Sequence, residues 1–304
     1  MTNSQQKRVE RFVSENFYHF SRGDKQMFKT INTLAIAVSL SLLGFTQAQA
    51  SLLAHWKFDE TSGTTAADSS GNGNTGTLTN MPGSEWTTGK VGGGLAFDGV
   101  DDYVLTSAII GPTGTSARTV AMWFATTTSN QAMLQYGGGS FGGNFRMRLD
   151  GNDGILTFDP SHANKKLLSP SVNDGAWHHM AITWAGGGNG LDDSTITFFV
   201  DGIEYADGTY TGTGSTTTDG TFSVFRPWYT ISTDTNHATS VIGAAQSADD
   251  VSNVFDHWQG VIDEVRIYDS ALTAAQIQAL VPEPSTALLL CLGLMALATG
   301  RRNR

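Results

Sequence analysis

Cysteine is almost missing from this sequence. The 304 residues hold one, Cys291, close to the C-terminus. A disulfide needs two cysteines and a cysteine-based zinc site needs several, so both are excluded. Proline is also scarce, with 7 residues against 35 glycines, and the glycines follow no three-residue period. A collagen-like fibre is therefore excluded as well.

Positive charge is the second shortage. Residues 51–281 hold 9 Lys and Arg against 24 Asp and Glu, a net charge of −15, whereas the whole chain carries −10. A segment this acidic is repelled by nucleic acid and by anionic lipid, so we expect no nucleic-acid partner. The same charge suits cations, calcium above all.

The N-terminal end carries an export pattern. After Met27 a short basic start leads into an apolar run over 31–45, and Ala48-Gln49-Ala50 has the small-x-small form of a cleavage site. This order is typical of a secretory signal peptide that signal peptidase removes after Ala50. The alternative, a membrane anchor, needs about 20 apolar residues. We therefore interpret residues 1–50 as an extension plus signal peptide, with the true start at Met27.

The C-terminal end, residues 281–304, has three parts. Pro282-Glu283-Pro284 comes first, an apolar run over 287–299 follows, and three arginines lie among the last four residues. This order resembles the PEP-CTERM sorting signal of Gram-negative bacteria that make extracellular polysaccharide. The resemblance implies that exosortase, a membrane protease, recognises Pro282, Glu283 and Pro284 and removes the tail.

An α-helical membrane segment of this kind would hold the chain in the inner membrane transiently, before release to the cell surface or extracellular matrix. The alternative is a plain C-terminal anchor that is never cut. The apolar run over 287–299 is short for a permanent span, which favours the transient one.

The middle of the chain alternates between apolar and polar residues in short runs, as β-strands do. Such runs include 52–58, 120–124 and 196–200, and Asp201-Gly202 after the last of them predicts a tight hairpin with 203–205 as the return strand. We expect one short helix, over 273–280, with Thr273 as its N-cap. The sequence therefore predicts an all-β, two-sheet sandwich or jelly roll.

Five motifs follow one another along this middle part. They are His55–Gly63, Asp68–Gly76, Gly94–Val104, Gly175–Ala181 and Ile262–Asp269. In this order they resemble the laminin-G-like jelly-roll domain of the concanavalin A-like lectin/glucanase superfamily, over about residues 51–280. The Gly/Thr-rich stretch 207–240 is longer than this resemblance leads us to expect.

One loop has the composition of a cation site. Asp68, Ser70 and Asn72 set oxygen side chains at every second position before Gly73, and Asn74 adds another. The spacing imitates the first half of an EF-hand loop, but the twelfth position is Thr79 rather than Glu, so an EF-hand is rejected.

The other half of the site is assigned to Asp263. On the expected strand 260–268 it would share an apolar face with Val265 and Ile267, while Glu264 and Arg266 would face water. A carboxylate on an apolar face is costly unless it is paired or binds metal. Members of the resembled family often carry a structural calcium, which implies that Asp68, Asn72, Asn74 and Asp263 could meet around one.

Two alternatives to this site stay open. Residues 68–76 could form an Asx-type turn, with Asp263 satisfied by backbone N–H groups. Asp101 and Asp102 could form a second cation site, although acidic turn residues are usually just solvated.

Aromatic residues offer a possible carbohydrate surface. Trp228 and Tyr229, in the long 207–240 stretch, are the candidate ligand-binding pair, and the alternative is a hydrophobic plug that anchors that stretch. Five other tryptophans lie in expected strands and are assigned to the core: Trp56, Trp123, Trp177, Trp184 and Trp258. His178 and His179 are adjacent, so they should point to opposite faces and take packing roles.

No catalytic pattern emerges. Glucanases of the resembled superfamily carry Glu-x-Asp-x-x-Glu on one strand, and the sequence has no such motif. We therefore predict no enzyme but an exported, non-catalytic binding or matrix protein that contacts extracellular polysaccharide or cell-surface glycans. The alternative is a glycan-active hydrolase or lyase whose catalytic residues the sequence does not reveal.

Overall fold

The computed structural model describes residues 50–281, apart from 109, 138–142, 153, 161–163, 169, 187–195, 206–215, 219–221, 226–238 and 248–251. For 216–218 and 222–225 it describes the backbone alone. The predicted ligand-binding pair, Trp228 and Tyr229, and the predicted sorting residues Pro282, Glu283 and Pro284 lie outside the described residues.

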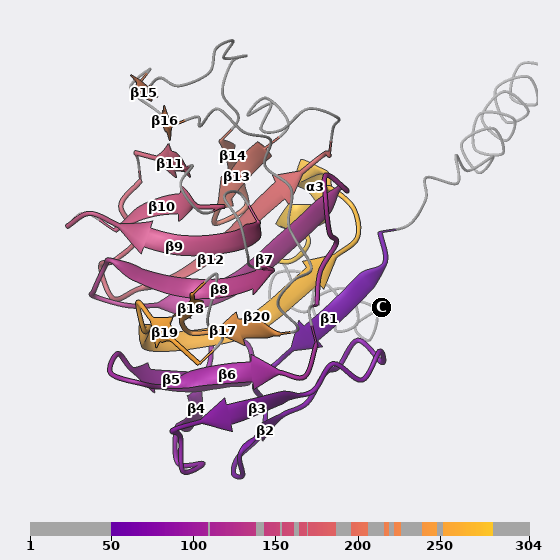
Figure 1. The fold of residues 1–304 in the computed structure, drawn as a ribbon, viewed down its shortest axis with the longest axis vertical. Helices are drawn as coiled ribbons and strands as arrows, with labels where there is room; N and C mark the ends of the chain where they lie inside the picture. Colours follow the sequence, from indigo (N-terminus) through magenta and orange to yellow (C-terminus); the bar gives the residue numbers. More distant parts are fainter. Residues whose placement is uncertain are drawn as a thin grey trace, which may run out of the picture. The chain divides into compact units, whose positions relative to one another are not determined.

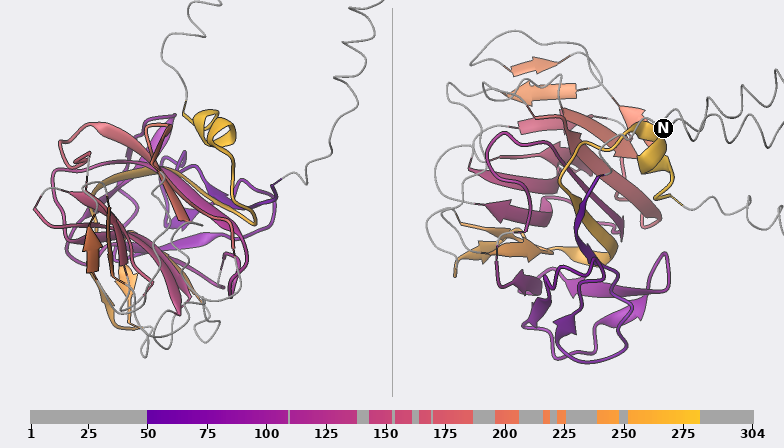
Figure 2. Two further views of the ribbon diagram at one scale, coloured as in Figure 1. Left: turned by 90° about the horizontal axis from the view of Figure 1, so that it is seen from above. Right: turned by 90° about the vertical axis from the view of Figure 1, so that its right-hand side faces the viewer.

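An eight-stranded and a ten-stranded antiparallel sheet make up the fold (Figures 1 and 2). The eight-stranded sheet runs β14-β13-β12-β7-β20-β5-β4, with β1 also paired to β20. Its strands are β1 (Leu52–Trp56), β4 (Trp86–Thr88), β5 (Gly93–Asp98), β7 (Arg118–Ala125), β12 (Trp177–Trp184), β13 (Ile196–Val200), β14 (Ile203–Tyr205) and β20 (Gln259–Tyr268).

The ten-stranded sheet runs β15-β16-β11-β10-β9-β8-β17-β6-β3-β2. Its strands are β2 (Thr65–Ala66), β3 (Gly76–Thr79), β6 (Tyr103–Thr106), β8 (Gln131–Gly137), β9 (Asn144–Asp150), β10 (Ile155–Phe158), β11 (Asn164–Leu167), β15 (Thr216–Thr218), β16 (Phe222–Phe225) and β17 (Ser240–Ile242). A small third sheet pairs β18 (Ala245–Gln246) with β19 (Val254–Phe255). The predicted all-β sandwich is thus confirmed.

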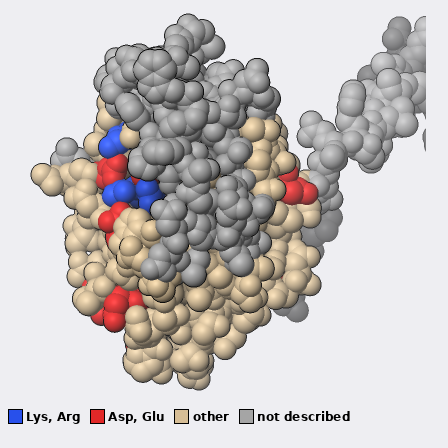
Figure 3. Space-filling model, viewed as in Figure 1, with Lys and Arg blue, Asp and Glu red and all other residues tan. Residues whose placement is uncertain are grey.

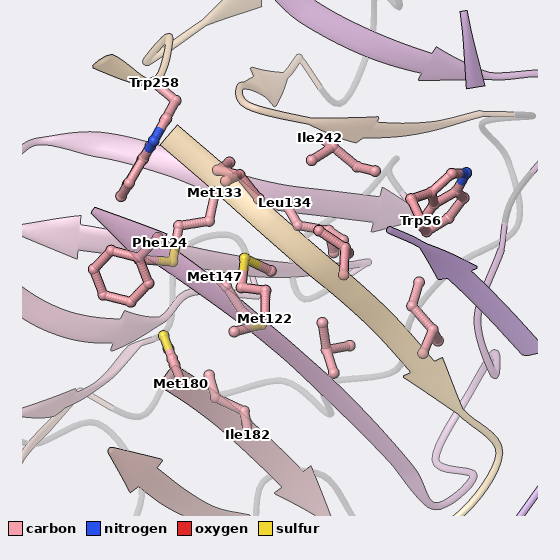
Figure 4. Packing of buried hydrophobic residues seen from close by; sticks show 14 of the residues in the cluster. Trp56, Met122, Phe124, Met133, Leu134, Met147, Met180, Ile182, Ile242 and Trp258 are labelled. Atoms are coloured by element: carbon pink, nitrogen blue, oxygen red, sulfur yellow. The ribbon is translucent and has the colours of Figure 1, made fainter. Parts of the chain in front are cut away.

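Alternation along the strands builds the core between the two large sheets. Met122 and Phe124 of β7 point inward, and so do Met147 of β9 and Leu134 of β8, all fully buried (Figure 4). Burial of such side chains is the main favourable term in folding, about 25 cal/mol for each Å² of apolar surface removed from water.

The predicted hairpin is present. Asp201 and Gly202 link β13 to β14 with φ values of 51° and 78°. Two positive φ values define the type I′ turn, whose twist matches that of paired strands.

The predicted helix is shorter than expected. α3 covers Ala274–Gln278, with Thr273 as its N-cap. Gln276 N donates to Thr273 Oγ1 and Thr273 N donates to Gln276 Oε1, which completes a capping box. Ile277 of this helix is fully buried.

α3 covers one end of the outer face of the eight-stranded sheet. A second apolar cluster forms there, distinct from the main core, and Ala50 and Leu280 pack against its edge. Its buried members are Ala121, Ala181, Phe199, Leu272 and Ile277.

The expected faces of β20 are wrong, and a β-bulge is the reason. The pairing of β20 with β7 shifts between Asp263 and Arg266, and Glu264 has a φ of 56°. An extra residue moves every later side chain to the other face. Val265 and Ile267 therefore enter the core, whereas Asp263 faces outward opposite Trp123. Glu264 is not in water either, because it is only 3% exposed.

We expect residues 51–280 to fold without either end, because the described strands and the buried members of both apolar clusters lie within them. A purified chain of 51–280 should give one cooperative thermal transition by calorimetry. A chain that stops at residue 270 should melt several degrees lower, since it lacks the buried Leu272 and Ile277. Equal melting temperatures would show that α3 adds no stability.

Candidate functional site

Protein donors fully engage the carboxylate of Asp68. Its Oδ1 accepts from the backbone N–H groups of His55 and Ser70, both at 2.9 Å. Its Oδ2 accepts from Asn74 N at 2.9 Å and from Ser70 Oγ at 2.8 Å. Burial by itself raises the pKa of Asp68, but the backbone hydrogen bonds outweigh it and hold the pKa below its usual value.

The two asparagines of this loop are hydrogen-bonded to strand β1. Asn72 Nδ2 donates to the carbonyl oxygens of Leu52 and Leu53, and Asn74 Nδ2 donates to that of Leu53 at 2.8 Å. Trp56 Nε1 in turn donates to Asn74 O. The loop therefore closes on itself through Asp68 and is held to β1 through its amides.

Asp263 belongs to a different network. Its side chain is fully buried on the outer face of the eight-stranded sheet, beneath the turn between β4 and β5. Val91 N donates to its Oδ2 at 2.9 Å, while its Oδ1 has no hydrogen-bond partner. Burial raises the pKa of Asp263 to about 7. A Cβ on Gly89 would lie 2.7 Å from Oδ2, so this turn needs glycine there.

The structure thus groups Asp68, Asn72 and Asn74 and leaves Asp263 apart. No hydrogen bond among the described residues joins the two networks. The loop has the geometry of the Asx turn that the sequence offered as the alternative, and its Asp68 oxygens already serve N–H and O–H donors. The shared calcium site stays a prediction.

A second group of acidic side chains gathers at the turn between β5 and β6. Asp98, Asp101 and Asp102 place carboxylate oxygens within 4.8 Å of one another. The sequence analysis named Asp101 and Asp102 as a possible second cation site but did not include Asp98. Burial raises the pKa of Asp102, and the neighbouring carboxylates add to the effect. Hard oxygen ligands of this kind suit calcium.

A cavity of about 310 Å³ opens near the start of β20. It is lined by Ala125, Thr126, Thr127, Gly175, Gln259 and Gly260. This lining holds no charged or aromatic side chain, so it offers neither an acid nor a stacking surface for a sugar ring.

His178 and His179 do point to opposite faces. His178 lies beside Phe124, with Asp201 2.9 Å from its Nδ1 and Asp174 3.2 Å from its Nε2. The hydrogen bond with Asp201 is the main reason that its pKa is raised. His179 is fully buried against Trp123, and burial lowers its pKa to about 4.

A charged network lies on the outer face of the ten-stranded sheet, and sequence reasoning missed it. Figure 3 shows basic and acidic side chains side by side in this region. We call it the ion-pair ladder, and its members are Arg146, Arg148, Asp150, Asp159, Lys166 and Asp256. The signal available in the sequence was Arg146-x-Arg148-x-Asp150, which alternates with the buried Phe145, Met147 and Leu149.

Arg148 is the centre of the ladder. Its Nε lies 2.7 Å from Asp150 Oδ1 and its Nη1 lies 3.1 Å from Asp256 Oδ2. Lys166 Nζ lies 2.8 Å from Asp150 Oδ2 and so extends the ladder to β11. At the other side Arg146 Nη2 meets Asp159 Oδ2 at 2.6 Å. The side chains of Lys166 and Asp256 are the most open, at 31% and 28% exposed.

Family comparison agrees with this architecture. The model of the concanavalin A-like lectin/glucanases superfamily matches residues 98–230 and 223–278, more than half of the chain. The chain belongs to this superfamily. Residues 280–304 match the PEP-CTERM protein-sorting motif, which confirms the C-terminal resemblance. A search of curated proteins finds no match.

Solved structures with a similar fold include domain 4 of the extracellular arabinanase AbnA from Geobacillus stearothermophilus, in complex with arabinotriose. It is 22% identical, with a TM-score of 0.49 over 77% of this chain and 99% of that one. The SAP-like pentraxin of Limulus polyphemus is 16% identical, with a TM-score of 0.43 over 62% of this chain and 80% of the pentraxin.

The sialidase of Trypanosoma rangeli in complex with sialic acid is 14% identical, with a TM-score of 0.41 over 76% of this chain and 32% of the sialidase. At these identities and TM-scores, none of the three likenesses bears on the activity of this superfamily member. Over the described part of the chain, no helix has the length and apolarity to cross a membrane.

We expect Asp68→Ala to lower the melting temperature of this superfamily member both in calcium and in EDTA. The substitution leaves the backbone N–H groups of His55, Ser70 and Asn74 without their acceptor, and because these bonds are only partly buried the total cost is about 1–3 kcal/mol. Melts of the parent in calcium and in EDTA test the metal prediction separately. A calcium-dependent rise that Asp68→Ala and Asp263→Ala both abolish would support one shared site, whereas a rise that Asp102→Ala alone abolishes would place the calcium at the Asp98, Asp101 and Asp102 group.

Two buried groups should give the stability opposite dependences on pH. Because the pKa of Asp263 is raised, its protonated carboxyl stabilises the folded chain. This stabilisation is fully present below pH 3.8, the usual pKa of the group, and is lost as the pH rises towards 7. The lowered pKa of His179 contributes stability above 6.5, which is lost as the pH falls towards 4. Each pKa unit corresponds to about 1.4 kcal/mol.

Single variants should separate these dependences. Asp263→Asn should steepen the fall in melting temperature from pH 6.5 to 4.5, and His179→Phe should steepen the fall from pH 4.5 to 7. Melting curves across this range are the measurement. Parallel curves for the parent and both variants would contradict the buried, shifted titrations.

Proposed function

We propose that this chain is an exported, non-catalytic binding protein of the cell surface or extracellular matrix. It contacts polysaccharide through the outer face of the ten-stranded sheet, at the ion-pair ladder. The sorting motif at 280–304 supports export and processing by exosortase, after a transient stay in the inner membrane. The observation that carries the binding role is the ladder itself.

The ladder offers fixed donors and acceptors to a polyhydroxylated ligand. Ion pairs to Asp150 and Asp256 hold the Arg148 guanidinium, so little side-chain freedom is left to lose on binding. Lys166 and Asp256, the most exposed members, can meet sugar hydroxyls directly. Positive and negative charges balance within the ladder, which favours hydroxyl recognition over simple attraction of polyanions.

The burial of the carboxyls whose pKa is raised is in keeping with a non-catalytic role. A glycosidase needs a carboxylic acid with a raised pKa that touches its substrate. In the described ranges, Asp102 and Asp263 have pKa values shifted upward, but they are only 5% and 0% exposed. Neither carboxyl is open to a sugar.

We expect the exported protein to retain polysaccharide without shortening it. Pull-down on a β-glucan, an arabinan and alginate tests binding, and a reducing-sugar assay on the same three tests cleavage. Lys166→Ala and Asp256→Ala should each weaken binding about tenfold, as loss of one charged hydrogen bond predicts.

Glu204→Ala is the matched control, since it removes an exposed charge from the eight-stranded sheet. Equal loss in all three variants would count against the ladder. Release of reducing ends would instead support the glycan-active enzyme.

A further inference from the structure

The start of β1 meets the end of β20 through a pair of reciprocal contacts. Ser51 N donates to Asp269 Oδ1 at 2.8 Å, and Asp269 N donates to Ser51 O at 3.1 Å. Both residues are exposed. The Ser51–Asp269 contact therefore places a carboxylate directly against a backbone nitrogen, at the surface, one residue after Ala50.

The expected signal-peptide cleavage changes the chemistry of that nitrogen. Hydrolysis of the Ala50–Ser51 peptide bond adds one water, leaves a carboxylate on Ala50 and gives Ser51 a free α-amino group. With an ordinary pKa of about 7.7–8.0, most of that group is an ammonium at neutral pH. The atom that donates to Asp269 as a neutral amide then carries a full positive charge in the mature chain.

We propose that Asp269 is the receiving site for the new N-terminus, so that signal-peptide removal creates an ion pair that locks β1 onto β20. This proposal rests on the export step of the proposed function. A charged donor strengthens a hydrogen bond to a carboxylate that is already in place, without any rearrangement of the backbone.

The ion pair would lie at the start of β1, where it can hold the end of this strand in place. Among the described strands, β20 is the one that pairs with β1 along its length, and the free end of such a strand opens most readily. β1 also accepts the hydrogen bonds of the 68–74 loop at Leu52 and Leu53. Cleavage removes the apolar contact of Ala50 with the cluster beneath α3, and the ion pair compensates at the same point.

The test uses the exported protein purified from its native host, whose N-terminal residue is read by mass spectrometry. At pH 6.5 an acetylating reagent modifies the α-amine ahead of lysine, because the α-amine has the lower pKa. Acetylation removes the charge of Ser51 but keeps an N–H donor, so it isolates the ion pair from the hydrogen bond.

We expect acetylation to lower the melting temperature of the parent by about 1–3 °C, the effect of one exposed ion pair in a domain of this size. In Asp269→Asn the same acetylation should have no effect. Asp98→Asn is the matched control, because Asp98 is also exposed and accepts a backbone N–H, from Val100 at 2.7 Å. It should keep the full response to acetylation.

The rate of acetylation gives a second reading. The Ser51 amine should react about threefold faster in Asp269→Asn than in the parent or in Asp98→Asn. An equal response of all three proteins to acetylation would overturn the ion pair. An exported chain that does not begin at Ser51 would also overturn the proposal, because the cleavage site would then be wrong. Mass spectrometry of the N-terminal residue distinguishes this failure from the absence of the ion pair.

Discussion

The pairing of strand β20 is the constraint on which most of this structure depends. β20 lies between β7 on one side and β5 and β1 on the other, so it joins both ends of the described chain to the centre of the eight-stranded sheet. Its Ile262, Val265 and Ile267 enter the main core. Without β20, β1 would lose the strand with which it pairs. The 68–74 loop, which is hydrogen-bonded to β1, would then lose its support as well.

The bulge at Glu264 divides β20 into two parts with different tasks. Before it, Asp263 faces outward and holds the turn between β4 and β5 through Val91 N. At it, Glu264 meets His55 Nε2 at 2.7 Å and also pairs with Arg266, so a nearly buried carboxylate has partners. Burial works to raise the pKa of Glu264, but the hydrogen bond from His55 and the charge of Arg266 lower it. One irregular residue thus keeps the core apolar while three polar side chains remain on the outer face.

The two outer faces of the sandwich differ in character. On the eight-stranded sheet, α3 and the turn above Asp263 bury apolar and polar groups. On the ten-stranded sheet, two members of the ion-pair ladder are partly open to solvent, Lys166 at 31% and Asp256 at 28% exposed, although Arg146 is buried. This contrast is the physical reason to look for polysaccharide contacts on the ten-stranded side.

The sequence by itself determined the β-sandwich, the Asp201–Gly202 hairpin, the capped helix and the sorting motif, because each follows from local rules of alternation, turn chemistry or composition. It also indicated the loop of Asp68, Asn72 and Asn74, because Ser70 and Asn74 donate to Asp68 from within the loop itself. The contacts of the loop with β1 come from residues 13 or more positions away and needed the fold. Only the tertiary structure decided the face of Asp263, since a bulge depends on how β20 pairs with β7. The ladder likewise needed the fold, because Asp159 and Asp256 reach Arg146 and Arg148, and Lys166 reaches Asp150, from separate segments that only sheet pairing and the β18–β19 hairpin bring together.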